Sequence, residues 1–289
     1  MSNHPLPKAE DECPDWVKGL ADAALTSGTG QFWDALAGSV SAILENHGIV
    51  VFRYSGGNEP ALVFSNFNSR VSRGDFREYR TRAYLLDPTY LAFQKRLPGG
   101  IHLLRKLAAD RFFHSEFYRT YYVQTGMSDE LCIFCWIGHD DLIVISALRS
   151  KKISAFSASG VRFLRQINTL ISSLVCRHVA LGPSTQSPAS SVSAVEPTLN
   201  IGGEGILTQR ELAIANLILR GNSSPSMSLL LGISIETVKV HRRHIYRKLN
   251  ISSQAELFAL AMNRTADANR VERGRRLLPS GGRPPAQAG

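Results

Sequence analysis

Hydrophobic periodicity divides the first 181 residues into helical and extended segments. Apolar residues recur at helical spacing in several stretches, which predicts amphipathic helices over residues 15–25, 30–48, 75–96, 110–126 and 157–181. Shorter runs rich in β-branched and aromatic residues predict strands at 49–55, 61–67, 130–138 and 142–150. Gly48 is expected to close the second helix. Asp87-Pro88 is expected to interrupt the third, because a proline disfavours helical backbone in the residue before it.

The predicted strands are joined in hairpins, with helices before, between and after them. This order predicts an α/β domain in which helices cover an antiparallel sheet. PAS, GAF and autoinducer-receptor domains share that outline. The N-terminal segment therefore resembles a sensor domain at the level of the fold.

The C-terminal pattern is helical throughout, and four helices fit into about 56 residues. Each helix begins at a residue whose side chain can cap free N–H groups: Thr208, Ser224, Ser234 and Ser253. Glu211 follows Thr208 by three residues, which predicts a capping box. A short turn containing Gly232 separates the second and third helices. That arrangement predicts a helix-turn-helix within an all-α domain.

The third of these helices is strongly cationic. Residues 234–249 carry five Lys or Arg side chains and one Glu. At about 100° per residue, Val238, Ile245 and Leu249 share one face, which is expected to pack against neighbouring helices. The opposite face gathers Glu236, Lys239, Val240, Arg243 and Arg247. In a helix-turn-helix the second helix of the pair lies in the major groove, so this face is expected to meet DNA.

Charge is distributed unevenly along the 289 residues. Residues 1–206 hold 20 basic and 19 acidic side chains, whereas residues 207–289 hold 13 basic and 5 acidic side chains. The net charge of +9 therefore belongs almost entirely to the C-terminal third, which indicates a polyanionic partner. Ser, Pro and Gly are abundant between the two parts, as in a linker. The predicted domains are a sensor-like domain at 1–181, a flexible linker at 182–206, a DNA-binding domain at 207–263 and a disordered basic tail at 264–289.

Short motifs of the C-terminal segment resemble the DNA-binding domain of the LuxR/FixJ/GerE family of bacterial transcription regulators. They are LTQRE, LILRG, LGIS, TVKVH and IYRKLNISSQAEL, in the family's order and at its intervals. The resemblance implies a sequence-specific DNA-binding transcription regulator that works as a homodimer, with its last helix, 254–262, at the dimer contact. The chain departs from the family pattern at Ala213, where an acidic residue is usual, and at 226–228, where the second helix is less charged.

The resemblance also implies roles for single residues. By this resemblance, Lys239, Val240 and Arg243 would contact DNA bases. Thr237, Arg242 and Lys248 would contact DNA phosphates. The helical wheel adds Arg247 to this surface. Double-stranded DNA is thus the main expected partner, and RNA polymerase is a further partner to consider for a transcription regulator.

Two kinds of sensor are considered for the N-terminal segment. A phosphorylation receiver begins with a strand and clusters Asp residues at strand ends. This chain begins with a helix and places Asp140-Asp141 in a tight turn, so a receiver is not expected. An acyl-homoserine-lactone receptor is the alternative, because FREYRTRAYLLDPTY resembles that family's aromatic stretch leading to Asp-Pro. The resemblance implies that Asp87 binds the ligand amide and that Tyr79 or Tyr84 adds a polar aromatic contact.

Other features leave these alternatives open. A helix break also explains Asp87-Pro88 and is the preferred interpretation. The downstream Trp of the lactone receptors is missing from QKRLPGGIHLLRKL. A group of tyrosines is expected either to line a pocket or to pack in the core: Tyr118, Tyr121 and Tyr122. A small-molecule effector that controls DNA binding or dimerisation is therefore expected, without a chemical identity.

Catalysis is not expected. The residues that could form a metal site or supply a nucleophile are His114, His139, Asp140, Asp141 and Ser146. No phosphate loop, nucleophile elbow or HExxH pattern accompanies them. Cys132 and Cys135 stand three apart in a predicted strand, where their thiols point to opposite faces and cannot easily share a metal. Both are expected to be buried structural thiols, and no cofactor or metal is expected.

Nothing in the sequence indicates a membrane. No apolar run approaches the roughly 18 residues of a membrane span. The first residues are acidic and lack the apolar segment of a secretory signal. A cytoplasmic location is therefore expected.

Overall fold

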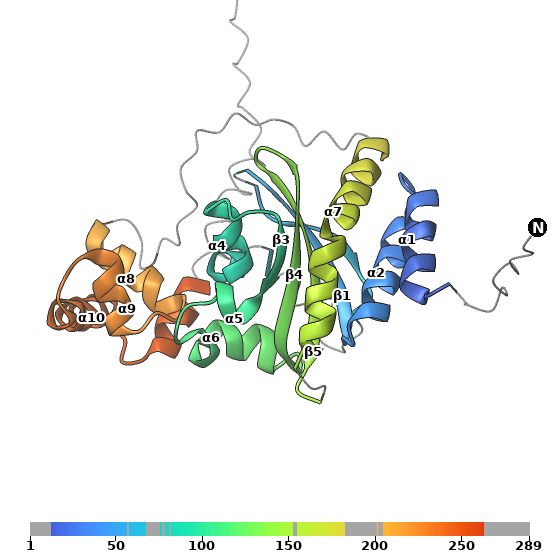
Figure 1. The fold of residues 1–289 in the computed structure, drawn as a ribbon. Coiled ribbons are helices and arrows are strands. Elements are labelled where there is room, and N and C mark those ends of the chain that lie inside the picture. The colour runs from blue at the N-terminus through green and yellow to red at the C-terminus, as the bar shows by residue number, and fades with distance from the viewer. Residues whose placement is uncertain are drawn as a thin grey trace, which may run out of the picture. The chain divides into compact units, whose positions relative to one another are not determined.

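The computed structural model describes residues 13–56, 58–67, 76, 79–80, 82–152, 155–182, 201 and 205–262 (Figure 1). The chain divides into two compact units, one within residues 1–197 and one within residues 198–289. Most of the predicted linker and all of the predicted tail lie outside the described residues. No helix in the described part is long and apolar enough to cross a membrane.

A five-stranded antiparallel sheet forms the middle of the N-terminal unit, in the order β2-β1-β5-β4-β3 (Figure 1). The strands are β1 Gly48–Ser55, β2 Ala61–Ser65, β3 Gly100–Leu103, β4 Met127–Gly138 and β5 Asp141–Ser150. β4 and β5 form the predicted hairpin, in which Gly138 pairs with Asp141. The predicted antiparallel sheet is confirmed. The edge strand β3 is an addition that the hydrophobic pattern did not indicate.

Three long helices cover one face of this sheet: α1 Asp15–Leu25, α2 Phe32–Ile43 and α7 Ala158–Leu181 (Figure 1). The main apolar core lies between them and the sheet. Val51, Ile133 and Ile145 supply it from the strands, and Leu36 and Leu164 supply it from the helices. Because side chains alternate along a strand, the residues next to these in sequence point to the opposite face.

Short helical segments cover that opposite face (Figure 1). They are η1 Ala83–Leu86, α4 Pro88–Gln94, α5 Leu104–Leu107, η2 Phe112–His114, α6 Glu116–Tyr118 and the π-helical turn η3 Arg119–Val123. Aromatic rings make much of the contact with the sheet: Phe52 of β1 lies 5.1 Å from Tyr79, and Tyr54 lies 5.6 Å from Tyr90, measured between ring centroids. The unit therefore has three layers, with the sheet in the middle.

Two of the helices predicted in this unit differ from those in the structure. α2 ends at Ile43, and Gly48 instead begins β1. A Cβ on Gly48 would lie 2.8 Å from the Cα of Phe67, so the glycine permits a close approach of two backbones. The single helix predicted over 110–126 is broken into η2, α6 and η3. The break occurs because Ser115 caps a new helix by accepting the N–H of Tyr118 at 3.1 Å.

The C-terminal unit contains α8 Gln209–Leu219, α9 Ser224–Leu231, α10 Ile235–Leu249 and a fourth helix described over 254–262. The predicted all-α domain is confirmed. The capping box is present: Thr208 Oγ1 accepts the N–H of Glu211 at 3.2 Å, and Glu211 Oε2 accepts the N–H of Thr208 at 2.8 Å. The core of the C-terminal unit includes the fully buried side chains of Met227, Val238 and Ile245.

The turn between α9 and α10 contains the predicted helix end and the predicted helix cap. Gly232 ends α9 with a φ of +63°, where glycine is favoured. Ser234 caps α10 by accepting the N–H of Thr237 at 3.0 Å. The predicted cap of α9 is wrong by one residue, because Ser223 and not Ser224 accepts the N–H of Ser226. Two adjacent serines have the same capping chemistry, so the pattern could not choose between them.

Candidate functional site

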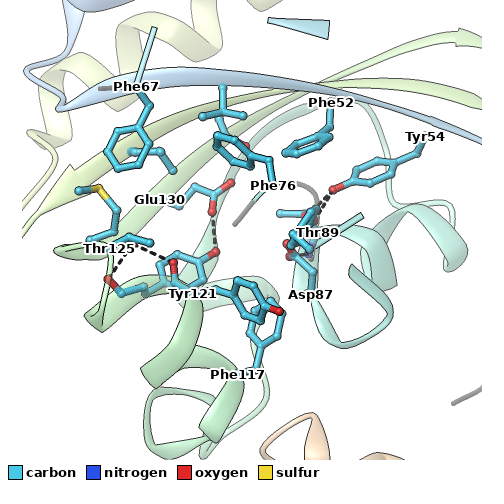
Figure 2. A pocket seen from close by; sticks show the side chains of 16 residues that line it. Phe52, Tyr54, Phe67, Phe76, Asp87, Thr89, Phe117, Tyr121, Thr125 and Glu130 are labelled. Atoms are coloured by element: carbon cyan, nitrogen blue, oxygen red, sulfur yellow. Dashed lines mark hydrogen bonds between the residues drawn. The ribbon is translucent and has the colours of Figure 1, made fainter. Parts of the chain in front are cut away.

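A cavity of about 90 Å³ lies between the sheet and the short helical segments of the N-terminal unit (Figure 2). Of the 16 described side chains that line it, eight are aromatic: Phe52, Tyr54, Phe67, Phe76, Tyr79, Phe117, Tyr121 and Tyr122. The remainder combine apolar and polar groups: Val50, Asp87, Thr89, Thr125, Met127, Glu130, Ser146 and Leu148. A mostly apolar wall with a few convergent polar groups is the usual composition of a small-molecule site.

Asp87 enters the cavity from the start of α4. Pro88 fixes the first turn of this helix, and Asp87 Oδ1 caps it by accepting the N–H of Thr89 at 2.7 Å. Oδ2 accepts the hydroxyl of Tyr79 at 2.6 Å, and the Tyr54 hydroxyl lies 3.1 Å from that of Tyr79. Burial raises the pKa of the Asp87 carboxyl, although the hydrogen bonds from Tyr79 and Thr89 oppose this effect. The expected helix break is present, and the same carboxyl lines the cavity.

Glu130 enters the same cavity from β4 (Figure 2). Its Oε2 accepts the hydroxyl of Tyr122 at 2.6 Å, and its Oε1 accepts the thiol of Cys132 at 3.2 Å. Burial and then the charge of Asp87 raise the pKa of the Glu130 carboxyl. The sequence prediction did not include Glu130. Glu130 follows Asp129 at the border of the apolar run LCIFCW, so its position in the sequence did not distinguish it from an exposed acidic residue at the start of a strand.

The tyrosines expected at a ligand site divide into two groups. Tyr79 lines the cavity. Tyr84 is not among the described lining residues and packs edge-on against Tyr90, with ring centroids 4.6 Å apart. Tyr118, Tyr121 and Tyr122 were predicted either to line a pocket or to pack in the core. Tyr121 and Tyr122 line the cavity.

The residues considered for catalysis have other contacts. His139 and Asp140 bind Arg96 beside the hairpin turn. Asp141 forms an ion pair with Arg53 at 2.5 Å. His114 lies in η2, and Ser146 lies in the cavity wall. Within the described ranges, no group of three or more His, Cys, Asp or Glu side chains could hold a metal ion.

Cys132 and Cys135 lie on opposite faces of β4, as predicted. Both are buried free thiols. Cys132 donates to Glu130 in the cavity layer, whereas Cys135 lies 3.6 Å from the hydroxyl of Ser172 on α7. They therefore contact different layers of the unit.

α10 exposes its charged face within the C-terminal unit. Val238 and Ile245 are fully buried, which confirms the predicted packing face. The exposed residues of the opposite face are Glu236, Lys239, Val240, Arg243 and Arg247. Val240 is 43% exposed and shares this face with Lys239 and Arg243. Thr237 lies in the first turn and is exposed, and Arg242 is half-buried.

Lys248 differs from the other cations of α10. Its ammonium donates to Glu211 Oε2 at 2.6 Å, and the two side chains are 36% and 5% exposed. Burial would raise the pKa of Glu211, but hydrogen bonds from Lys248 and Thr208 outweigh burial and lower the pKa to about 2. The ion pair ties the end of α10 to the start of α8 and neutralises much of the Lys248 charge inside the unit.

Comparison with known proteins identifies the family. The sequence profile of the family described as "Bacterial regulatory proteins, luxR family" matches residues 205–261. Over 185 residues the chain is 32% identical to an HTH-type transcriptional regulator in the exeN 3′ region of Aeromonas salmonicida, and the match covers 61% of this chain and 93% of that protein. The chain belongs to the LuxR family of bacterial transcriptional regulators. It is thus a DNA-binding regulator with a helix-turn-helix, as the sequence predicted.

Two further similarities concern parts of this LuxR-family chain. The oxygen regulatory protein NreC of Staphylococcus carnosus (strain TM300) is 33% identical over 97 residues, which cover 30% of this chain and 45% of NreC. The LBD domain of VqsR from Pseudomonas aeruginosa superposes with a TM-score of 0.51 at 19% identity, and the match covers 58% of this chain and 98% of that domain. At this identity the second similarity concerns the fold alone.

Acid is expected to destabilise the C-terminal unit of this LuxR-family protein. The pKa of Glu211 is lowered from 4.5 to about 2, so the stability that it contributes is complete above about pH 5 and is lost as the pH falls toward 2. Glu211→Gln removes this contribution. We expect the variant to be less stable by about 1–3 kcal/mol at pH 7, with a smaller difference at pH 3. Hydrogen-exchange mass spectrometry of α8 and α10 peptides in the full chain measures both differences.

Glu236→Gln is the matched control for this prediction. Glu236 is exposed and forms only a surface ion pair with Lys239, so its replacement should change protection by a few tenths of a kcal/mol. Equal protection of Glu211→Gln and the wild type at pH 7 would contradict the stabilising role of the Glu211–Lys248 pair.

Proposed function

We propose that this regulator binds a small molecule in the cavity of its N-terminal unit and that the bound molecule controls DNA binding or dimerisation. The observation that carries the proposal is the cavity itself, whose aromatic wall surrounds two buried carboxyls at fixed positions. Aromatic side chains give a ligand large apolar contact, and a few fixed polar groups orient it. The hydrogen bonds from Tyr79 and Thr89 to Asp87 hold one such group in place.

The proposed DNA contacts come from α10, and those to the bases lie on its exposed face. Lys239, Val240 and Arg243 would meet base edges in the major groove, because they lie at the centre of that face. The phosphate contacts would come from Thr237, Arg242, Arg247 and Lys248. Among these, Lys248 has the smallest free charge, since its ammonium already binds Glu211.

An acyl-homoserine lactone is a second candidate ligand. The observation in its favour is the Tyr79–Asp87 hydrogen bond in the cavity wall, where a ligand amide N–H would donate to the carboxyl. The size of the cavity argues against it. An engineered protein cavity of about 150 Å³ holds a molecule such as benzene, whereas this cavity measures about 90 Å³. A lactone with an acyl chain would require the cavity to expand.

Filling the cavity with a larger side chain is expected to prevent the effector from binding. Val50→Phe adds a ring to the cavity wall, and Val63→Phe makes the same change at a site on β2 that is 37% exposed. Mass spectrometry of small molecules released from the purified full chains should detect a compound in the wild type and in Val63→Phe, reduced about tenfold or more in Val50→Phe. DNA affinity should respond to that compound in the first two proteins only.

Overpacking costs about 1–3 kcal/mol, so the folded state of Val50→Phe is checked by its thermal unfolding. If no compound accompanies the wild-type chain and Val50→Phe binds DNA as the wild type does, the proposed role of the cavity is wrong.

We also propose that the regulator binds DNA as a homodimer through two half-sites. One reading helix covers few base pairs, and two copies related by a two-fold axis would occupy half-sites about one helical turn apart. Footprinting should therefore show two protected segments roughly 10 base pairs apart, and light scattering of the complex should give two chains per duplex. A footprint on one half-site with a single chain bound would contradict this arrangement.

A further inference from the structure

Two carboxyls lie in the cavity wall without a basic partner among the described residues. Asp87 and Glu130 are each 6% exposed, and one comes from the helical layer and the other from the sheet. Their donors are neutral groups: the hydroxyls of Tyr79, Thr89, Tyr122 and Ser146, the N–H of Thr89 and the thiol of Cys132. None of the 16 described lining residues is Lys, Arg or His.

The other buried acidic residues of the described part each have a basic partner. Besides Asp87 and Glu130, the buried acidic side chains in the described part are Asp129 and Glu211. Asp129 binds Arg105, and Glu211 binds Lys248. Buried carboxylates are normally paired in this way, because removing an unpaired charge from water is costly. Within the described ranges, the two buried carboxyls that lack such a partner are those that face the cavity.

We propose that the effector supplies the missing charge: the cavity binds a small molecule that carries an ammonium group, placed between Asp87 and Glu130. This inference rests on the proposed ligand-binding role of the cavity and specifies the ligand's charge. An ammonium group donates up to three hydrogen bonds, which suits two carboxyls that approach from different walls.

The remaining wall of the cavity suits the same ligand. Rings from the helical layer and the sheet surround the space between the carboxyls, among them Phe52, Phe76, Phe117 and Tyr121 (Figure 2). Aromatic faces attract cations, and desolvated contacts of this kind contribute about 2 kcal/mol. A metal ion fits less well, because hard cations prefer six or more oxygen ligands and this wall is mostly carbon. A short alkylammonium matches both the rings and the volume of about 90 Å³.

Proton release is expected to accompany binding. Burial raises the pKa of both carboxyls, which favours their neutral form while the cavity holds no cation. A bound ammonium favours their charged form. The other titratable groups that face them stay protonated, because burial also raises the pKa of Tyr54, Tyr79, Tyr122 and Cys132. Affinity for a cation should therefore rise with pH, whereas affinity for a neutral molecule should not.

The test compares two probes that have the same number of non-hydrogen atoms, n-propylammonium and 1-propanol. Calorimetric titration of the full chain at pH 8 should give an affinity for n-propylammonium at least about tenfold higher than for 1-propanol. The affinity for n-propylammonium should fall as the pH is lowered from 8 through the raised pKa values of the two carboxyls. Glu130→Gln should lower the affinity for n-propylammonium much more than the affinity for 1-propanol and so remove most of the preference. Glu59→Gln, an exposed acidic position, should preserve the preference.

The outcomes separate this inference from the proposal on which it rests. Equal affinities for the two probes, or no binding of n-propylammonium, would overturn the inference of a cationic ligand. A neutral compound released from the wild-type chain and absent from Val50→Phe would then still support a ligand-binding cavity. If Glu130→Gln does not fold, the pH dependence of the wild type decides: an affinity for n-propylammonium that does not fall at any pH between 8 and the ordinary carboxyl range near about 4 overturns the inference.

Discussion

The binding of duplex DNA by this regulator is expected to weaken by about a thousandfold when the salt concentration rises from 50 to 200 mM. Each phosphate neutralised by a protein cation releases counterions, and about six such contacts give a loss of this size. The cations available on α10 include Lys239, Arg243 and Arg247, all exposed, and a dimer would present each of them twice. Fluorescence anisotropy titrations of the full chain over a salt series measure the slope.

A variant in the N-terminal unit serves as the control for the salt dependence of DNA affinity. Lys18→Ala removes an exposed cation from α1, outside the DNA-binding unit, and should leave the slope unchanged. An affinity that stays constant across this salt range would show that electrostatic contact with phosphates does not drive the binding.

Replacing Arg243 by Ala should weaken binding to the specific site by about 1–3 kcal/mol and reduce the preference for that site over random DNA. Arg243 is exposed on α10, on the side opposite Val238 and Ile245. A guanidinium in that position can donate two hydrogen bonds to a guanine edge, and a wrong base cannot accept both. Paired titrations with specific and scrambled duplexes measure the change in preference.

Arg247→Ala is the matched control, because it makes the same change one helical turn later, near the end of α10. We expect it to weaken both duplexes by a similar factor and to reduce the salt slope by about one unit. Lys248→Ala is less suitable, since it would also leave Glu211 buried without its partner. A specific-to-random ratio that is unchanged in Arg243→Ala would mean that another face of α10 reads the bases.

The C-terminal unit could be predicted almost completely because its determinants are local. The capping box of Thr208 and Glu211, the left-handed Gly232 and the 3.6-residue spacing of Val238 and Ile245 each act within a few residues. The one wrong boundary came from adjacent residues with equal capping ability. The pairing of Lys248 with Glu211 could not be predicted, because it joins two helices.

The N-terminal unit was predicted less completely because long-range pairing determines much of it. The β4–β5 hairpin is local and was found. β3 has four residues, too few to show an alternating pattern, and it becomes a strand by pairing with β4. The cavity depends on β1, β4 and β5 lying side by side, which brings Val50, Glu130 and Ser146 to one wall. Asp87 could be singled out by its Pro88, whereas Glu130 acquires its role only in the folded sheet.

The rates at which reagents modify the two thiols of β4 should report local opening of the N-terminal unit. Cys132 is enclosed by the cavity layer and Cys135 by the layer of α7, and neither is accessible in the folded unit. An alkylating reagent can therefore reach each thiol only when its own layer opens. Ligand occupancy that tightens the cavity would slow the labelling of Cys132 alone, so two positions three residues apart in sequence report separately on the two halves of the unit.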